Sequence, residues 1–252
     1  HDPLRRQRQM CIRDRAMSAY FKSIGADLTM SDLSTHEGEW VEPRGVNYHG
    51  YTLYELPPNG QGFAALMMLN ILKQIDVRQF ERGSPELFHY MVEAKRLAFE
   101  AMAGTFADPD FADIPLDALL SDGFAKRQFA RIRKDAVIEP KFLAVPLEGE
   151  GDTTYLTVVD KSGLMVSLIQ SNYRGMGSGL VPKGLGFMLQ DRGELFSLED
   201  GHPNVYAPGK RPFHTIIPAF LMKDDEPFMS FGLMGGGMQP QGLSLIHISE
   251  PT

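Results

Sequence analysis

Hydrophobic and polar positions alternate most regularly in the middle of the chain, between residues 153 and 171. From residue 155 to 159, a tyrosine, a threonine and a valine fall on one face of an extended segment, and a leucine and a valine fall on the other. Residues 160–163 read Asp-Lys-Ser-Gly, which is typical of a turn, and a second apolar run follows over residues 164–171. This pattern predicts a β-hairpin.

Apolar residues recur at helical spacing in several segments before the hairpin. The spacing predicts a helix over residues 63–75. The motif Ser84-Pro85-Glu86 predicts the start of another, because serine caps a helix, proline fits the first turn and an acid suits the positive helix end. Shorter helices are predicted over residues 16–25, 116–120 and 122–131.

Short alternating runs predict strands in the remaining segments, over residues 40–41, 51–56, 216–222 and 229–232. The first two would be joined through residues 43–45 and 49–50. Ser31 is predicted to cap a short turn. The mixture of helices and strands predicts a fold of the α/β (α+β) class.

The glycine-rich segment Pro-Pro-Asn-Gly-Gln-Gly at residues 57–62 precedes a predicted helix. Such a loop can bind an anion on free backbone N–H groups. Because the Walker and dinucleotide spacings are absent, a plain connection between strand and helix is favoured. His89 is interpreted as a packed or solvent-facing residue, and Asp108 and Asp110 as parts of a loop rather than a metal site.

The net charge of -7 argues against a nucleic-acid or anionic-membrane partner. No apolar run reaches the roughly 18 residues that a membrane-spanning helix needs. The single cysteine, Cys11, allows no disulfide framework. Together these features indicate a globular enzyme and leave its compartment open between cytoplasm and periplasm or exterior.

Both ends of the chain differ in kind from its middle. Residues 5–15 resemble the translation of a sequencing-library adapter, and residues 243–252 resemble its reverse complement read in frame. A basic N-terminal arm and a short C-terminal strand are the alternative. We expect residues 1–15 and 243–252 to be foreign, and the chain between them to be the interior of a longer gene.

Four motifs in one order carry a resemblance to a known family. They are Thr153-Thr154 at the start of the hairpin, Gly-Met-Gly-Ser-Gly at 175–179, Lys-Arg-Pro at 210–212 and three glycines at 235–237. In this order, from about residue 16 to 242, the chain resembles the gamma-glutamyltranspeptidases. The resemblance implies an N-terminal-nucleophile hydrolase αββα sandwich, incomplete at both ends, with two stacked, mainly antiparallel sheets between helices.

The resemblance also implies self-cleavage between Asp152 and Thr153. The family's precursor cuts itself before a threonine, which becomes the nucleophile of the small subunit, with the terminal amine as its base. Residues 16–152 would then belong to the large subunit and residues 153–242 to the small one. The acidic run at 148–152 predicts an exposed linker in which a cut costs little. An ordinary surface hairpin is the alternative that the local pattern favours.

The remaining site residues follow from the same resemblance. Ser171, eighteen positions after the nucleophile, would hydrogen-bond its hydroxyl. Gly235 and Gly236 would stabilise the oxyanion through backbone N–H groups. The family's substrate-binding serine pair falls on His214 and Thr215.

The chain departs from the family's pattern at residues 189–196. Aligned on Phe196, the aspartate that holds a substrate ammonium group in the family is Leu195, which accepts no hydrogen bond. Arg192 adds a positive charge and Glu194 a negative one, and both are candidates for substrate binding. This pattern resembles the divergent branch with cephalosporin-acylase-like members.

We therefore expect a self-processing gamma-glutamyl transferase or hydrolase that cleaves glutathione-like amides. It would pass the acyl group from Thr153 to water or to an amine or peptide acceptor, with no metal or organic cofactor. A related acylase with another acyl group, such as glutaryl, and an uncut binding homologue are the alternatives. The family's large-subunit arginine for the substrate carboxylate is not found in this chain.

Overall fold

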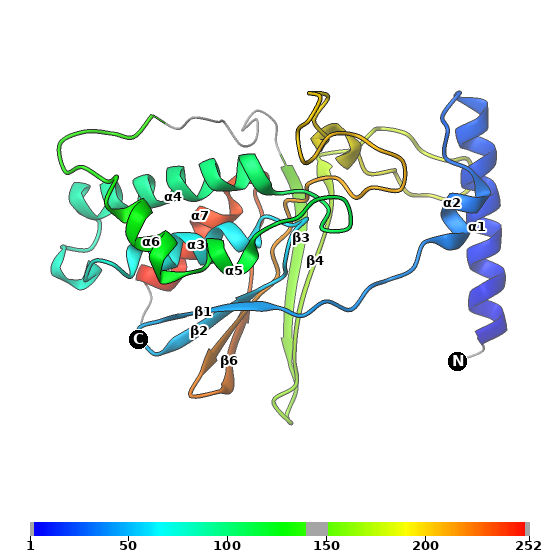
Figure 1. Ribbon diagram of the computed structural model, residues 1–252. Coiled ribbons are helices and arrows are strands. Elements are labelled where there is room, and N and C mark those ends of the chain that lie inside the picture. The colour runs from blue at the N-terminus through cyan, green and yellow to red at the C-terminus, as the bar shows by residue number, and fades with distance from the viewer. Residues whose placement is uncertain (1–2, 140–150, 250–252) are drawn as a thin grey trace.

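The computed structural model describes residues 3–139 and 151–249 of the chain (Figure 1). A four-stranded antiparallel sheet has the order β1-β2-β5-β6, and a separate hairpin consists of β3 and β4. The strands are β1 (Arg44–Tyr48), β2 (Tyr51–Glu55), β3 (Gly151–Val159), β4 (Met165–Arg174), β5 (Ala219–Lys223) and β6 (Glu226–Phe231). The α-helices are α1 (Pro3–Ser23), α2 (Met30–Thr35), α3 (Gly62–Leu72), α4 (Pro85–Thr105), α5 (Leu116–Leu119), α6 (Asp122–Phe129) and α7 (Gln239–Ser249). The short 3-10 helices are η1 (Val77–Gln79), η2 (Arg192–Leu195) and η3 (Gly236–Met238).

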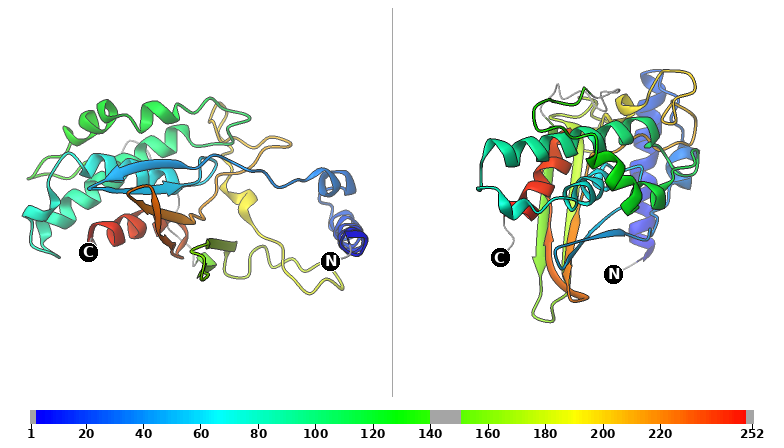
Figure 2. Two further views of the ribbon diagram at one scale, coloured as in Figure 1. Left: turned by 90° about the horizontal axis from the view of Figure 1, so that it is seen from below. Right: turned by 60° about the vertical axis from the view of Figure 1, so that its left-hand side comes forward.

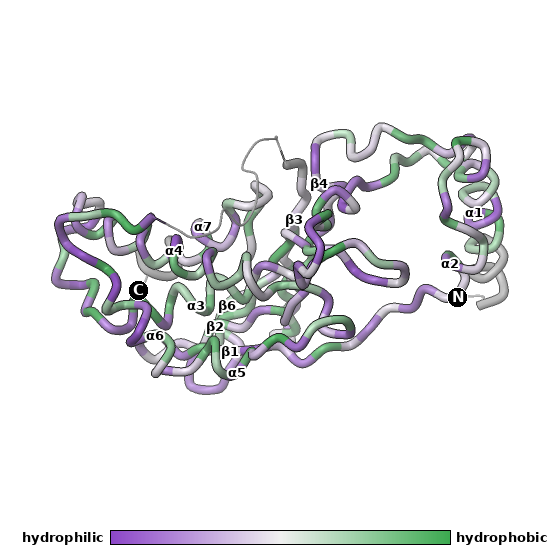
Figure 3. Tube along the Cα trace, turned by 45° about the horizontal axis from the view of Figure 1, so that its top comes forward, coloured by the Kyte–Doolittle hydropathy of each residue, from purple (hydrophilic) through white to green (hydrophobic). Residues whose placement is uncertain are grey.

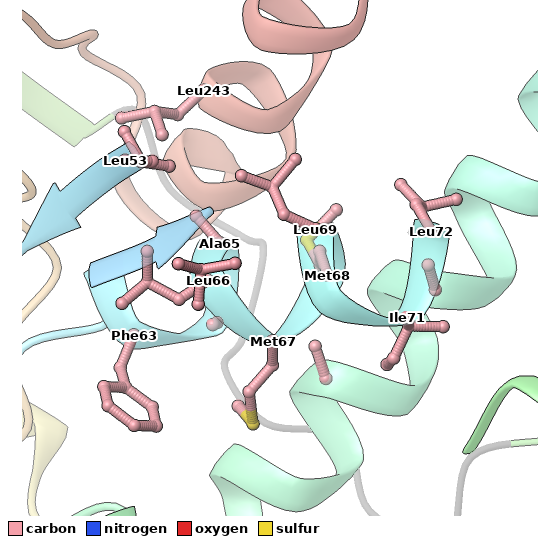
Figure 4. Close-up of a cluster of buried hydrophobic side chains, with 14 of the residues drawn as sticks. Leu53, Phe63, Ala65, Leu66, Met67, Met68, Leu69, Ile71, Leu72 and Leu243 are labelled. Carbon is pink, nitrogen blue, oxygen red and sulfur yellow. The ribbon is translucent and has the colours of Figure 1, made fainter. Parts of the chain in front are cut away.

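Helix α3 forms the centre of the hydrophobic core. Ten of its eleven residues are buried, and its own apolar side chains point in all directions around the helix axis, as expected for a helix enclosed by other elements. It packs against α4, α6, α7 and the first two strands. Figure 4 shows its side chains spreading from the helix in several directions, with Leu53 of β2 and Leu243 of α7 nearby. The predicted helix at 63–75 is confirmed, although it ends at Leu72.

The start of α4 forms as its sequence predicts. Ser84 Oγ accepts a hydrogen bond from the backbone N–H of Leu87 at 3.2 Å, and Pro85 occupies the first turn. The prediction for α2 is wrong in its cap: Thr29, and not Ser31, caps the helix. Thr29 and Asp32 form a reciprocal capping box, because the Asp32 carboxylate accepts from the Thr29 backbone N–H at 2.7 Å.

The first strand lies later in the chain than predicted. Trp40 is fully exposed and belongs to no strand, whereas β1 begins at Arg44 and pairs antiparallel with β2. His49 and Gly50 connect the two strands with positive φ angles of 51° and 90°. The sheet therefore uses the predicted linker as its edge strand. In Figure 3 the segment before β1 is largely hydrophilic, while α3 is hydrophobic.

The β3–β4 hairpin forms at the predicted place, and Thr157 pairs with Ser167. It packs beside β6 through polar side chains: Thr157 Oγ1 hydrogen-bonds to Ser230, and Ser167 Oγ donates to the Phe231 carbonyl at 3.3 Å. The aliphatic face points the other way and is exposed, with Leu156 at 42% and Val158 at 53%. The molecule thus layers helices, the four-stranded sheet and the hairpin (Figure 2).

The predicted boundaries at residues 15/16 and 242/243 both fall inside helices. Helix α1 runs through the first and packs against α2, and the two stand apart from the rest of the molecule (Figure 1). Helix α7 runs through the second, and Leu243 and Ser244 are completely buried. The foreign origin of the ends stays a prediction. The predicted acidic linker lies mainly at residues 140–150, outside the described residues.

Candidate active site

Thr153 and Ser171 lie directly opposite each other on β3 and β4. They are register partners, so their side chains project from the same face of the hairpin. Thr153 is 7% exposed, and its Oγ1 donates to Ser171 Oγ at 3.2 Å. The hairpin thereby brings together two hydroxyl groups that the sequence separates by eighteen positions.

A β-bulge creates this juxtaposition. The register shifts between Asp152 and Thr153, so that Asp152 pairs with Tyr173 while Thr153 pairs with Ser171. Tyr173 has a φ of 81°, an uncommon angle for a residue with a bulky side chain. Its backbone N–H donates to Ser171 Oγ at 2.8 Å, which orients that hydroxyl towards Thr153.

Arg192 is a deeply buried charged group beside β4. It is 3% exposed, and its Nη1 donates to Thr215 Oγ1 at 2.9 Å. Its guanidinium carbon lies 5.3 Å from the centre of the Tyr173 ring. Burial lowers the pKa of Arg192 to about 10, partly offset by Tyr173 and Asp191. At neutral pH the buried group still carries its charge.

Gln61 connects the segment that bears His214 and Thr215 to Gly236, one of the two predicted oxyanion glycines. Its side-chain Nε2 donates to the carbonyls of both Thr215 and Gly236, the latter at 2.8 Å. Its backbone N–H donates to the His214 carbonyl at 2.9 Å. The glycine-rich loop at 57–62 thus braces the segment around His214, which agrees with the plain connection favoured above.

Gly235 and Gly236 adopt φ angles of 134° and 55° at the start of η3, which contacts β3. Side chains rarely tolerate these angles, and a Cβ on Gly235 would lie 2.8 Å from Met238 Cγ. The two glycines therefore form a backbone turn beside the strand that carries Thr153.

His214 is neutral at physiological pH. Burial, and next the positive charge of Arg192, lower its pKa to about 3. Its Nδ1 accepts from the Ile216 backbone N–H at 3.3 Å. A neutral imidazole can offer a hydrogen bond to a substrate but supplies no charge.

Glu194 lies at the surface, near Tyr173. It is partly exposed and forms an ion pair with Arg174. It lines a cleft of about 610 Å³ together with Tyr173 and Leu195. Thr153 and Ser171 line a second cleft, of about 540 Å³, with Leu189 and Gln190. The structure thus groups Thr153 with Ser171 and Arg192 with Thr215, and leaves Glu194 at the surface.

Comparison with known proteins assigns the chain to a family. The family model described as gamma-glutamyltranspeptidase matches residues 15–249. The chain belongs to the gamma-glutamyltranspeptidase family.

Named relatives of this family differ in their substrates. The chain is 40% identical over 226 residues to the glutathione hydrolase-like YwrD proenzyme of Bacillus subtilis, covering 88% of this chain and 42% of that protein. It is 36% identical over 219 residues to the oxamate amidohydrolase proenzyme of Klebsiella pneumoniae, covering 87% of this chain and 40% of that protein. The chain therefore spans about two fifths of the length of these relatives.

A solved acylase structure shares the fold. The crystal structure of cephalosporin acylase from Bacillus halodurans superposes with a TM-score of 0.83 at 39% identity, covering 93% of this chain and 42% of the acylase. The mixed α/β fold is accordingly that of N-terminal-nucleophile hydrolases, as predicted.

Among residues 3–139 and 151–249, no helix is both long and apolar enough to cross a membrane. Within the same ranges, potential metal ligands do not gather in groups of three or more.

Gln61 and Tyr173 contact the candidate site residues, but the sequence motifs did not indicate either of them. Gln61 is a polar residue between two glycines, directly before a helix whose only polar side chain is Asn70. A polar residue at the start of such an apolar helix could have been identified from the sequence. Tyr173 has no such signal, because only the bulge turns its ring towards Arg192.

Proposed function

We propose that this chain carries the catalytic centre of a self-processing enzyme that cleaves gamma-glutamyl or related amides through an acyl-enzyme on Thr153. The observation that carries the proposal is the hydrogen bond between the Thr153 and Ser171 hydroxyl groups. Thr153 directly follows the peptide bond at which the family resemblance predicts a cut. The names of the two relatives, both proenzymes, support the same proposal.

The first use of Thr153 is the cleavage of its own chain. Its hydroxyl oxygen attacks the Asp152 carbonyl carbon, the peptide C–N bond breaks, and the hydroxyl proton passes to the nitrogen. The product is an ester between the Asp152 carbonyl and Thr153 Oγ1. Water hydrolyses this ester, which leaves a carboxylate at Asp152 and frees both the hydroxyl and the amine of Thr153.

The second use is turnover of substrate. The hydroxyl attacks the amide carbon, its proton moves through the free Thr153 amine to the leaving amine, and an acyl ester remains on Oγ1. Ser171 orients the hydroxyl, and backbone N–H groups at Gly235 and Gly236 stabilise the developing oxyanion. Water or an amine acceptor then removes the acyl group.

The acyl group is the part on which two candidate functions differ. Glutathione-like amides follow from the family and from the glutathione hydrolase-like relative. Leu195 at the position of the ammonium-binding aspartate favours instead an acylase for an acyl group without an amino group. Comparing a gamma-glutamyl with a glutaryl anilide separates the two.

Intact mass spectrometry of the complete gene product tests the self-cleavage. We expect two fragments that meet between Asp152 and Thr153. The Thr153→Ala variant, which lacks the hydroxyl, should remain a single chain, and Thr153→Ser should be cut because it keeps one. A single uncut mass from folded wild-type protein would rule out the mechanism and leave the binding homologue.

A further inference from the structure

The guanidinium group of Arg192 has one hydrogen-bond donor buried without a partner. Nη1 is used by Thr215 Oγ1, whereas Nη2 is buried and makes no hydrogen bond. Leaving a buried charged donor unsatisfied costs free energy, more than for a neutral group. Arg192 is 3% exposed, and the described part of the chain supplies no hydrogen-bond acceptor for its Nη2.

The charged neighbours of Arg192 do not supply its counter-ion. Asp191 raises the pKa of Arg192 only by its charge at a distance, and its carboxylate accepts from the Arg174 backbone N–H at 3.3 Å. Glu194 pairs with Arg174 instead. His214 has a lowered pKa and is neutral. Apart from the Tyr173 ring, the guanidinium has no charged or π partner among the described residues, and no carboxylate there forms an ion pair with it.

The position of Arg192 connects it to the proposed nucleophile. The Tyr173 ring lies against its guanidinium, and the Tyr173 backbone N–H holds Ser171, the partner of Thr153. On the other side, the Thr215 carbonyl shares Gln61 Nε2 with Gly236. Arg192 is therefore connected through Tyr173 to the segment proposed to hold the hydroxyl, and through Thr215 and Gln61 to the segment proposed to hold the oxyanion.

We infer that Arg192 binds a carboxylate of the acyl group, so that the substrate is the amide of a dicarboxylic acid without an α-ammonium group. This inference rests on the proposed acyl transfer at Thr153 and deepens it. A planar guanidinium presents paired N–H donors that suit a carboxylate. The same cation would repel an ammonium group, and Leu195 offers that group no acceptor.

Three anilides of one chain length test the inference on the complete gene product: glutaryl, its terminal amide glutaramoyl, and gamma-glutamyl p-nitroanilide. We expect kcat/KM for the glutaryl substrate to exceed that for glutaramoyl by tenfold or more, since the two differ only in the charge of the acyl terminus. The gamma-glutamyl substrate should be slower than glutaryl, because it adds the ammonium group.

Substitution of Arg192 should remove the discrimination. In Arg192→Gln the ratio of glutaryl to glutaramoyl should fall towards one, mainly through KM, and Arg192→Lys should keep part of it. Arg174→Gln is the matched control, because it removes an exposed arginine on β4 and should leave the ratio as in the wild type. Binding of glutarate, measured by calorimetry, should be lost in Arg192→Gln and kept in Arg174→Gln.

Thermal unfolding separates a binding role from a structural one. If Arg192 serves to bind a ligand, Arg192→Met removes a buried charge that lacks a counter-ion, and the Tm of the ligand-free protein should rise. Replacing buried charges by apolar residues often has this effect. Glutarate should raise the Tm of the wild type only.

The outcomes distinguish failure of the inference from failure of the proposed function. Cleavage at Thr153 with equal turnover of all three anilides would overturn the carboxylate site and leave the acyl transfer standing. Absence of both cleavage and turnover would overturn the acyl transfer. Glutarate that binds wild-type and Arg192→Gln protein equally, or a lowered Tm in Arg192→Met, would make Arg192 a structural residue.

Discussion

Glu55 shows how strongly a single position depends on its surroundings. It ends β2, is 1% exposed, and neither carboxylate oxygen has a hydrogen-bond partner. Burial raises the pKa of Glu55 to about 8, against a smaller opposing effect from the Leu56 backbone. Gly62 is needed beside it, since a Cβ there would collide with the carboxylate. The group is therefore protonated when the protein is folded at neutral pH.

The raised pKa predicts that stability falls as pH rises. The unfolded chain releases the Glu55 proton above pH 4.5, whereas the folded protein retains it until about pH 8. Between these values the free energy of unfolding falls by up to about 1.4 kcal/mol per pH unit. Glu55→Gln, which is neutral at every pH, should abolish this contribution, so its stability relative to wild type should increase from pH 5 to 8 in urea unfolding.

Comparing wild type with Glu55→Gln at the same pH separates the effect of Glu55 on stability from that of His214, which both proteins contain. His214 has a lowered pKa, so it destabilises the fold in the opposite direction, as pH falls below 6.5. Glu37→Gln, at an exposed position outside the helices and strands, is the control for the loss of one carboxylate. A constant difference between Glu55→Gln and wild type across this range would show that Glu55 titrates normally.

At the scale of secondary-structure elements, the β3–β4 hairpin contacts the four-stranded sheet through a small set of side chains. It is hydrogen-bonded within itself and joins β6 through side chains. Tyr155 lies against Gly232, directly after β6: a Cβ on Gly232 would lie 2.6 Å from the Tyr155 ring. This close approach sets how near Thr153 can come to the following glycine turn.

Gly232→Ala should consequently loosen the hairpin. The added methyl group overlaps the Tyr155 ring, and overpacking of this kind costs about 1–3 kcal/mol. We expect a lowered Tm and slower self-cleavage, measured by unfolding and by intact mass against time.

Gly104→Ala provides the control for this substitution. Gly104 lies in the last turn of α4 with open space around its Cβ position, so alanine there should not lower the stability of the protein. The double variant Gly232→Ala, Tyr155→Leu should recover part of the loss. If it recovers nothing, the ring contact is not the cause.

Across the whole molecule, Arg211 ties the helical part to the segment that bears His214 and Thr215. Its backbone N–H and its Nη2 both donate to the Asp108 carboxylate, each at 2.7 Å, and Asp108 is 1% exposed. Burial opposes ionisation of Asp108, but the hydrogen bonds from Arg211 outweigh it and hold its pKa below the usual value. After a cut before Thr153, this pair would join two separate subunits.

Asp108→Asn should weaken that junction. Hydrogen bonds to a charged group contribute about 1.5–3 kcal/mol, and the amide replaces one acceptor by a donor that faces Arg211. We expect a lower midpoint in urea unfolding and easier separation of the cleaved fragments in size-exclusion chromatography.

Glu39→Gln is the matched variant for Asp108→Asn. The Glu39 carboxylate contacts the same guanidinium, but it is 57% exposed and should contribute at most about 1 kcal/mol. Equal effects of the two substitutions would contradict the importance of burial at Asp108.

Elements with a clear local pattern were predictable from the sequence. The hairpin follows from alternation around the Asp-Lys-Ser-Gly turn, and the start of α4 from its Ser-Pro-Glu motif. The first strand was misplaced, because an exposed tryptophan resembles a strand residue when its burial is unknown. The cap of α2 was misplaced by two residues, because several hydroxyl side chains stand close together there.

The mixed α/β class and the hairpin were accessible from the order of residues, since local alternation and turn chemistry act over short distances. The family and the pairing of Thr153 with Ser171 were implied by a resemblance in the order of motifs, and the β-bulge beside Thr153 was not predicted. The unpaired Arg192, the neutral His214, the protonated Glu55 and the bracing role of Gln61 were decided only by tertiary structure. Charge state and hydrogen-bond satisfaction depend on burial and on which distant segments meet, and the chain acquires both only when it folds.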